Sequence, residues 1–296
     1  MNISPASLLL GIADFKSQAL NLLTNPTSDF KKDFLSALLS PQQALNNAST
    51  DALSLLTGSS GVTGLSPTGR NMALFDPESA YKMMSVINNR DATYKAQFSE
   101  VSQMQSGVTL MQDAGRSLGS IAPSASNDDI KSQLQGFTDQ YNWWIQRFNP
   151  DVQKGGLLAD TQAAQVSVYE LEQSVKNIFN GAKDGVHGLR DLGISIDPHT
   201  KLATLDIAKL DAILTTNKQG VVDTVQEFSV NFSKSAGLLN AAGNFIPNQL
   251  NNLNKVIHYV ADNKADLQAE FGTGDSAKPT GQIAKALAAY NQTYGV

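Results

Sequence analysis

The chain has 296 residues, enough for one large domain or two ordinary ones, and a net charge of −5. Without a basic excess to neutralise phosphates, it is not expected to bind nucleic acid, and the absence of Cys excludes disulfides, thiolate metal sites and Cys nucleophiles. Charged residues make up only 17% of the chain, so Asn, Gln, Ser and Thr must supply much of the polar surface. This composition favours an elongated helical protein with a thin core and extensive partner contact.

The chain shows no pattern of a secretory signal or a membrane helix. Leu8-Leu9-Leu10 is too short for a signal-peptide core, and no basic region precedes it. No apolar run approaches the roughly 20 residues that a membrane helix needs. We therefore expect no membrane insertion, and we expect any export to use a route without a cleaved signal peptide.

The first 74 residues are predicted to form short helices followed by a linker. Apolar residues in 1–56 recur at helical spacing, as at Leu8, Ile12 and Phe15, between turn residues such as Asn25-Pro26. These helices would form either a small helical unit or a flexible arm. Residues 57–74 are rich in Gly and Ser and indicate a flexible linker.

A helical stem domain is predicted over residues 75–271. Asp76-Pro77-Glu78 combines a cap, a first-turn Pro and a first-turn acid, and so begins a helix expected to run to Ile121. Three further helices are expected from apolar spacings of four and three residues, at 128–149, 161–181 and 248–271. Asp91 falls within the apolar seam of the first helix, either fixing its register or marking a solvated end.

A β-hairpin is predicted within the stretch Leu189–Leu214. Ile194 and Ile196 alternate with polar residues, a turn follows at Asp197-Pro198, and the return strand ends near Leu205. Asp206 is expected to cap the next helix, and a further helix follows it. Residues 272–296 are expected to form a second linker and a helical tail.

These elements predict a mainly α fold. We expect an elongated antiparallel helical bundle, or coiled-coil stem, with one small hairpin at about 194–205. The helix 77–121 would run antiparallel to the helix 248–271, and the helices 128–149 and 161–181 would pack alongside.

Aromatic and Met residues are the main candidates for partner contact. Trp144 and Tyr141 lie on the predicted seam, whereas Trp143 points aside, either packing under the hairpin or serving as an exposed anchor. Met residues such as Met84 could form a docking face, although core packing is the simpler interpretation. The candidate structural or interaction residues are Trp143, Trp144, Tyr141, Ile194, Leu205, Asp206, Met84 and Phe98.

No catalytic, cofactor or metal site is predicted. The three His residues are isolated in sequence, and neither a Walker-type phosphate loop nor a Gly-x-Ser-x-Gly elbow occurs. We expect no enzymatic activity, and a cluster of residues with shifted pKa in a deep pocket would reopen that question.

Three sequence blocks, Phe137–Asn142, Gly156–Asp160 and Leu192–Leu210, resemble the C-terminal part of the flagellar filament-capping protein family, also called hook-associated protein 2. Phe137-Thr138-Asp139-Gln140-Tyr141-Asn142 resembles the family's Phe-Val-x-x-Tyr-Asn helix, and Gly156-Leu157-Leu158-Ala159-Asp160 resembles its Gly-Pro-Leu-Leu-Gly-Asp segment. Leu192-Gly193-Ile194, followed after a turn by Leu205-Asp206-x-x-Lys209-Leu210, resembles its hairpin and the start of the next helix. The blocks cover about a hundred residues in the family's order.

The resemblance implies a divergent member that lacks the family's β-rich head domain, because only Ala122 to Ser126 separate the first long helix from the next. It implies a structural, self-assembling flagellar axial protein that forms homo-oligomers and contacts flagellin or hook-junction proteins, with an export chaperone as a further candidate partner. Such a protein would be cytoplasmic before export and extracellular afterwards. The alternative is a cytoplasmic helical binding module, such as a flagellar export chaperone or assembly adaptor.

Overall fold

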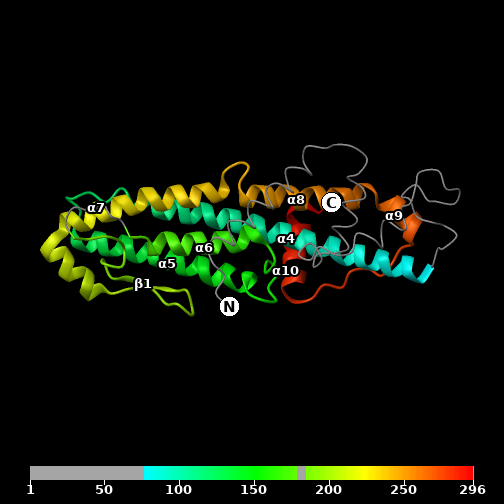
Figure 1. Cartoon of the computed structure of the whole chain (residues 1–296), viewed down its shortest axis with the longest axis horizontal. Helices are drawn as coiled ribbons and strands as arrows, with labels where there is room; N and C mark the ends of the chain where they lie inside the picture. The colour runs from blue at the N-terminus through cyan, green and yellow to red at the C-terminus, as the bar shows by residue number, and fades with distance from the viewer. Residues whose placement is uncertain (1–76, 179–184, 296) are drawn as a thin grey trace, which may run out of the picture. The chain divides into compact units, whose positions relative to one another are not determined.

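The computed structural model describes residues 77–178 and 185–295, and it confirms a mainly α fold with one small antiparallel hairpin (Figure 1). The chain divides into two compact units, 1–83 and 84–296. Within the first unit, the structure describes the start of helix α4, where Lys82 and Glu78 form an exposed ion pair of 2.6 Å. The helices predicted within 1–56 and the linker at 57–74 lie outside the described residues.

Helices α4 (Pro77–Leu118) and α5 (Asn127–Val152) differ at their ends from the predicted ranges. Helix α4 stops three residues before Ile121. The cap of α5 is Ser126, whose hydroxyl accepts a hydrogen bond from the backbone of Asp129 in a capping box. The predicted stop at Pro150 is wrong, because the backbone N–H of Gln153 donates to the carbonyl of Asn149 and so closes a last turn around the proline.

Helix α6 (Gln162–Lys176) is shorter than the predicted range 161–181. Its apolar face includes Val168 and Leu171 and ends at Val175. Ile178, which lies within the predicted range, does not continue this face, because it follows the end of the helix and its side chain is 66% exposed.

The hairpin agrees with the prediction. Strand β1 (Ile194–Ile196) pairs antiparallel with β2 (Ala203–Leu205), with Ile194 opposite Leu205. In the turn, a carboxylate oxygen of Asp197 accepts hydrogen bonds from the backbone N–H groups of His199 and Thr200, at 2.9 and 2.7 Å. These bonds hold the pKa of the Asp197 carboxyl below its usual value.

Helix α7 (Ile207–Asn240) begins at the predicted cap, Asp206, whose carboxylate accepts from the backbone of Lys209 at 3.0 Å. The two helices expected here are joined into one, with a kink at Asn217 (φ −148°, ψ 60°). Side chains connect α7 to α4 at Gln112 and Ser233 (3.2 Å) and at Asn240 and Gln105 (2.9 Å). From Gln105 to Gln112 in α4 the partner moves back from Asn240 to Ser233 in α7, so the two helices run antiparallel.

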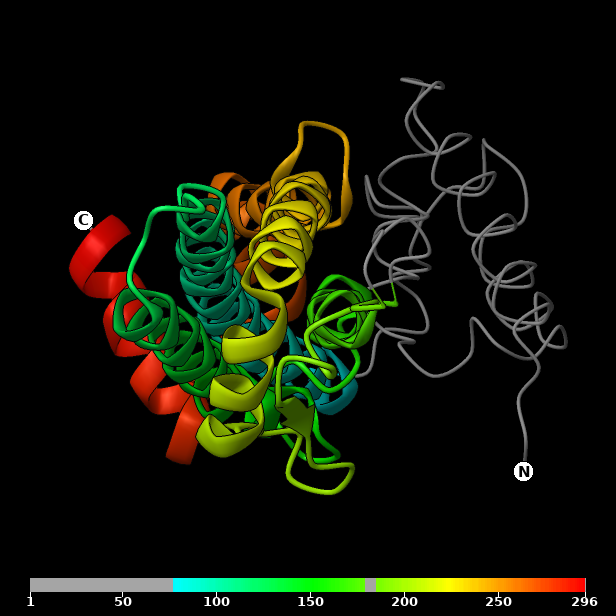
Figure 2. The ribbon, with the colours of Figure 1, turned by 90° about the vertical axis from the view of Figure 1, so that its left-hand side faces the viewer.

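Helices α8 (Phe245–Asp262) and α9 (Lys264–Phe271) replace the single helix expected at 248–271. The unbroken helix was a wrong prediction, because Asn263 leaves the helical conformation and uses its side-chain amide to bond the carbonyl of Tyr259 at 2.9 Å. In Figures 1 and 2, α8 continues the line of α7 and lies antiparallel beside α4. This orientation is the one that the sequence predicted for the C-terminal helix.

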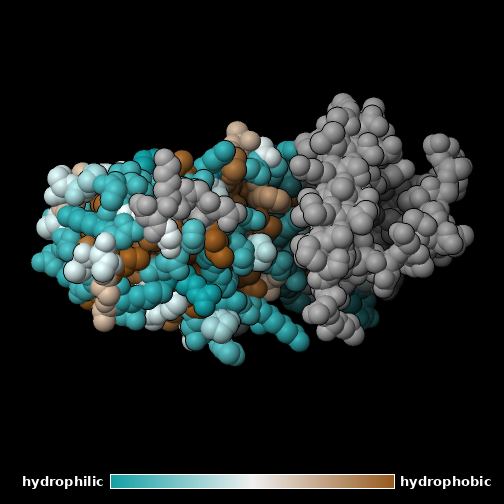
Figure 3. Space-filling model, turned by 60° about the vertical axis from the view of Figure 1, so that its left-hand side comes forward, coloured by the Kyte–Doolittle hydropathy of each residue, from teal (hydrophilic) through white to brown (hydrophobic). Residues whose placement is uncertain are grey.

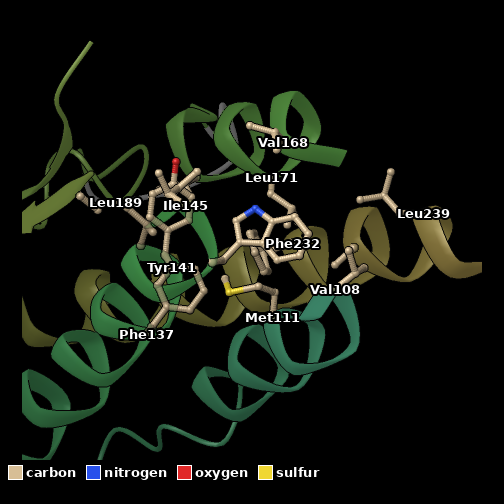
Figure 4. Packing of buried hydrophobic residues seen from close by; sticks show 14 of the residues in the cluster. Val108, Met111, Phe137, Tyr141, Ile145, Val168, Leu171, Leu189, Phe232 and Leu239 are labelled. Atoms are coloured by element: carbon tan, nitrogen blue, oxygen red, sulfur yellow. The ribbon is translucent and has the colours of Figure 1, made fainter. Parts of the chain in front are cut away.

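The core of the second unit lies between α4, α5, α6 and α7. Figure 4 shows Met111 of α4, Tyr141 of α5, Leu171 of α6 and Phe232 of α7 pointing into one shared interior. The ring of Phe137 meets those of Phe228 and Phe232 edge-on, each at 5.2 Å between centroids. The residues of α4 that continue its buried face after Val101 are Met104, Val108, Met111, Gly115 and Leu118.

The surface in Figure 3 mixes hydrophilic residues with scattered hydrophobic ones. None of the helices in residues 77–178 and 185–295 has the length and apolar character required to cross a membrane.

Candidate functional site

The predicted aromatic candidates on α5 separate into core and surface residues. Tyr141 and Trp144 have no exposed surface, whereas Trp143 is 43% exposed. The ring of Trp143 meets that of Phe148 edge-on at 6.2 Å. Of the two positions predicted for Trp143, the exposed one is observed, and whether it anchors a partner stays a prediction.

A buried acid lies beside Tyr141 at the junction of the stem and the hairpin. Burial raises the pKa of the Tyr141 hydroxyl, and the negative charge of Glu172 on α6 adds to that rise. Glu172 is itself buried and forms ion pairs with Lys176 on its own helix and with Lys201 at the hairpin tip. Lys201 has a left-handed backbone (φ 64°), so the turn holds a strained residue that reaches back to the stem.

Asn142 fastens the hairpin to α5. Its side-chain amide donates to the carbonyl of Ala203 at 2.9 Å, and its side-chain oxygen accepts from the N–H of Ala203 at 2.7 Å. The side chain thereby pairs with strand β2 as a neighbouring strand would. Asn142 is not among the site residues predicted from the sequence, although it closes the block that begins at Phe137.

The base of the hairpin joins β1 to the start of α7. Gly193 has φ 93°, and a Cβ there would approach the carbonyl oxygen of Asp206 to 2.7 Å. The N–H of Asp206 donates to the carbonyl of Gly193 at 2.9 Å. Ile194 is buried and Leu205, opposite it, is half-buried. The predicted residues Ile194, Leu205 and Asp206 are thus brought together here, in a joint that connects sheet and helix.

A second cluster joins α4 to α5 through two buried carboxylates. Arg147 pairs with Glu100 of α4 and, at 3.0 Å, with Asp151 one turn along α5. Its guanidinium also donates to Gln103 at 2.7 Å. Both carboxylates are only 7% exposed, and they line a cavity of about 380 Å³ whose wall includes Lys285. Arg147 and Asp151 are four residues apart, a spacing that places opposite charges on one face of a helix and could have indicated this ion pair from the sequence.

The electrostatics of this cluster depend on pH near neutrality. Burial raises the pKa of Glu100 to about 7; Arg147 opposes the rise, and the neighbouring Asp151 adds to it. The cluster is the kind that would reopen the question of catalysis. However, the cavity lining contains no His, Ser or Thr, and Arg147 already contacts both acids. We interpret the cluster as an ion-pair network within the bundle.

Phe98 and Met84 lie away from the hairpin, near the C-terminal segment. The ring of Phe98 meets those of Tyr290 and Tyr294 edge-on, at 5.9 and 5.3 Å. Both tyrosines belong to helix α10 (Gly281–Tyr294), which follows the predicted linker. Met84, Met104 and Met111 are buried, as core packing requires. The eight predicted residues therefore fall into separate places: the core, the hairpin joint, the α10 contact and the exposed position of Trp143.

The described residues contain no group of three or more His, Cys, Asp or Glu side chains placed to hold a metal ion. Comparison of the sequence with protein-family models and with curated proteins, and of the fold with solved structures, finds no match.

Proposed function

We propose that this protein is a structural component of the bacterial flagellum, resembling the filament-cap and hook-associated proteins and acting by self-assembly and contact with other axial subunits. The proposal rests on the three family-like sequence blocks. Its structural support is the way two of them meet: Asn142 ends the first block and bonds the hairpin, whose base at Gly193 and Asp206 belongs to the third. Residues that connect elements in this way hold the structure rigid, which is a structural role and not a catalytic one.

The exposed aromatic residues add to this support. Trp143 and Tyr169 are 43% and 58% exposed, and large aromatic side chains are frequent anchors of protein interfaces. A protein that assembles with other subunits needs such anchors outside its own core. The surface position of Trp143 is therefore the first place at which we expect a partner to bind.

Deletion of the gene in the source bacterium tests the proposal. We expect the deletion strain to lose motility, to show missing or shortened filaments by electron microscopy, and to shed flagellin into the medium. The protein itself should appear in the wild-type culture supernatant with an uncleaved N-terminus. Normal filaments together with no extracellular protein would contradict the proposal.

The same measurements address the alternative, a cytoplasmic export chaperone or assembly adaptor. Such a protein would stay inside the cell, and its deletion would reduce export of a particular axial subunit while the protein itself never reached the medium. Fractionation of cells and supernatant therefore separates the two functions.

A further inference from the structure

The C-terminal arm, defined here as residues 272–294, is held on α4 by a small set of polar contacts. The side-chain amide of Asn88 donates to the carbonyls of Thr273 and Asp275, at 3.1 and 2.9 Å. The N–H of Asp275 donates to the hydroxyl of Ser85 at 2.8 Å. The segment predicted to be a flexible linker is therefore docked along the helix at its first residues.

Gly274 fixes the register of this docking. Its φ of 61° lies in the left-handed region, and a Cβ there would come within 2.5 Å of the backbone nitrogen of Ser85. No side chain fits between the arm and the helix at this point. The contact therefore requires glycine at this position of the arm, while the bonds on either side use only its backbone atoms.

Helix α10 completes the arm, but its fit to the bundle is loose. Only Ala286 of α10 is fully buried, and Tyr290 and Tyr294 contact Phe98 through ring edges while remaining partly exposed. Two cavities border the helix, one of about 380 Å³ beside Ala286 and one of about 500 Å³ beside Leu287. Ala286 joins the core, with Ile283 and Leu287 packed against it, but these contacts are fewer than those of the other bundle helices, so detaching the arm requires less free energy than opening the core.

The arm covers a surface that runs from Ser85 and Asn88 of α4 to the cavity at Arg147 of α5. We infer that this surface is a docking site for the C-terminal arm of a second copy of the chain, so that two copies can exchange arms. The occupant is identified by the arm that already sits there, because the arm of another copy would make the same contacts. Exchange of an identical element is a low-cost route to association. Gly272, which follows α9 with φ 77° and is exposed, is the hinge.

The balance between the closed and exchanged forms depends on concentration. A short tether gives the chain's own arm an effective concentration in the millimolar range, so dilute protein favours the closed form. Exchange becomes favourable where many copies are crowded together or are refolded at high concentration. The inference does not depend on the flagellar assignment, because any setting that concentrates the chain would favour it.

The absence of Cys makes a direct test possible in the full-length chain. Since the Ser85 hydroxyl lies 2.8 Å from the Asp275 nitrogen, covalent geometry keeps the two Cα atoms within about 7 Å, near the upper limit for a disulfide. Separately purified S85C and D275C chains, one carrying a mass tag, are mixed, unfolded, refolded together at high concentration and oxidised. The mixed disulfide is then quantified on a non-reducing gel.

Arm exchange predicts a several-fold excess of the S85C–D275C product over the product of a control pair, S132C with D275C, because Ser132 is exposed on α5 but belongs to no arm contact. In the double variant S85C/D275C, oxidation of dilute protein should close the disulfide within one chain and prevent exchange. Adding F98A to the S85C chain should reduce the mixed product. Circular dichroism of each variant checks the fold.

The inference is overturned if the mixed product never exceeds the control pair and the double variant closes only within single chains at every concentration. Should S85C fail to fold, wild-type chain and a size-tagged copy are mixed and refolded together. Mixed dimers that persist after dilution then support exchange, and their absence at high concentration counts against it.

Discussion

Among single residues, Asn142 connects the helical stem to the hairpin most directly, because one amide satisfies both backbone groups of Ala203. A two-stranded hairpin is at best marginally stable by itself in water. The side chain of Asn142 takes the place of a third strand at the point where the hairpin meets α5. Losing it would leave a buried N–H and a buried carbonyl without partners.

We predict that Asn142→Ala lowers the free energy of unfolding by about 2 kcal/mol, since two hydrogen bonds are lost together. Urea denaturation followed by circular dichroism measures the change. Gln146→Ala, on an exposed position of the same helix, is the control and should change stability by no more than about 0.5 kcal/mol. Equal stability of the two variants would show that Asn142 does not support the hairpin.

Glu100 makes the stability of the bundle depend on pH. Its pKa is raised in the folded protein from 4.5 to about 7, so over that range the folded state binds more protons than the unfolded state. Stability is therefore highest below the unfolded value and decreases as pH rises through about 7.

We predict that the wild-type free energy of unfolding decreases between pH 5 and pH 8, by up to about 3 kcal/mol from Glu100 alone. Glu100→Gln mimics the protonated acid and should remove this part of the slope, so the variant should be more stable than wild type at pH 8. Chemical denaturation at several pH values provides the comparison. Parallel slopes in the two proteins would mean that Glu100 does not hold its proton in the fold.

For single residues, sequence patterns predicted the positions of buried apolar side chains better than the roles of polar ones. Tyr141 and Trp144 were placed correctly in the core because their spacing of three follows the helical repeat. Glu100 and Asn142 lie outside that repeat, and their roles depend on partners about 50 and 60 residues away, Arg147 and Ala203. A distant partner leaves no local signal, so only the folded arrangement identifies such residues.

Among the secondary-structure elements, the close approach of α4 and α7 depends on a small residue. A Cβ at Gly115 would lie 2.4 Å from the ring of Phe232, a contact that real side chains do not make. Phe232 cannot easily move, because it packs against Phe137 and Phe228. The helix pair therefore requires glycine at position 115 for packing.

We predict opposite effects for two Gly→Ala substitutions in helices. Gly115→Ala should destabilise the protein by about 1–3 kcal/mol through overpacking. Gly136→Ala, on an exposed turn of α5 with open space around its Cβ, should stabilise it by about 0.5–1 kcal/mol through helix propensity. Thermal denaturation of both variants compares them directly, and effects of the same sign would contradict this account of the packing.

Helix boundaries were predicted less well than the helices themselves. Pro150 was expected to end α5, yet it lies in the last turn, where its missing N–H costs only one bond of the helix. The apolar spacing continued across Asn263, although the backbone breaks there and the side chain bonds an earlier carbonyl. Apolar periodicity reports which face is buried, and it does not detect a local change of backbone conformation.

For the whole molecule, the two adjacent tryptophans have different roles: Trp144 supports folding, and Trp143 is available for association. Trp144 lies fully inside the core, whereas Trp143 presents much of its ring to solvent. Adjacent residues on one helix can thus serve two different needs. Under the proposed assembly function, only Trp143 would contact a partner.

We predict that Trp144→Ala destabilises the chain by about 3–5 kcal/mol, as expected for loss of a buried aromatic residue. Trp143→Ala should cost less than about 1 kcal/mol, because its ring meets Phe148 at an edge and its side chain is 43% exposed. Complementation of the deletion strain tests the functional half: a folded Trp143→Ala protein should restore motility less well than wild type. Full complementation would remove Trp143 from the proposed interface.

At this scale the fold class and the hairpin were predictable, whereas the pairing of helices was only partly so. The antiparallel direction of α8 beside α4 was expected, but the hydrogen-bonded contact of α4 with α7 was not. Apolar faces show that helices must pack, yet faces of similar composition can pair in several ways. Ser85 and Asn88 bind backbone atoms of the arm, and a pattern of side chains in the sequence does not predict such contacts.

The kink at Asn217 has a consequence for how α7 opens. The side-chain oxygen of Asn217 accepts the N–H of Gly220 at 2.9 Å, so the second half of the helix begins with a cap of its own. The first half is bonded beside the base of the hairpin, where the amino group of Lys209 donates to the carbonyl of Arg190, and the second half is bonded to α4. Each half can therefore lose its structure without unwinding the other, and amide hydrogen exchange should report two protection levels along one continuous helix, with the change between them at Asn217.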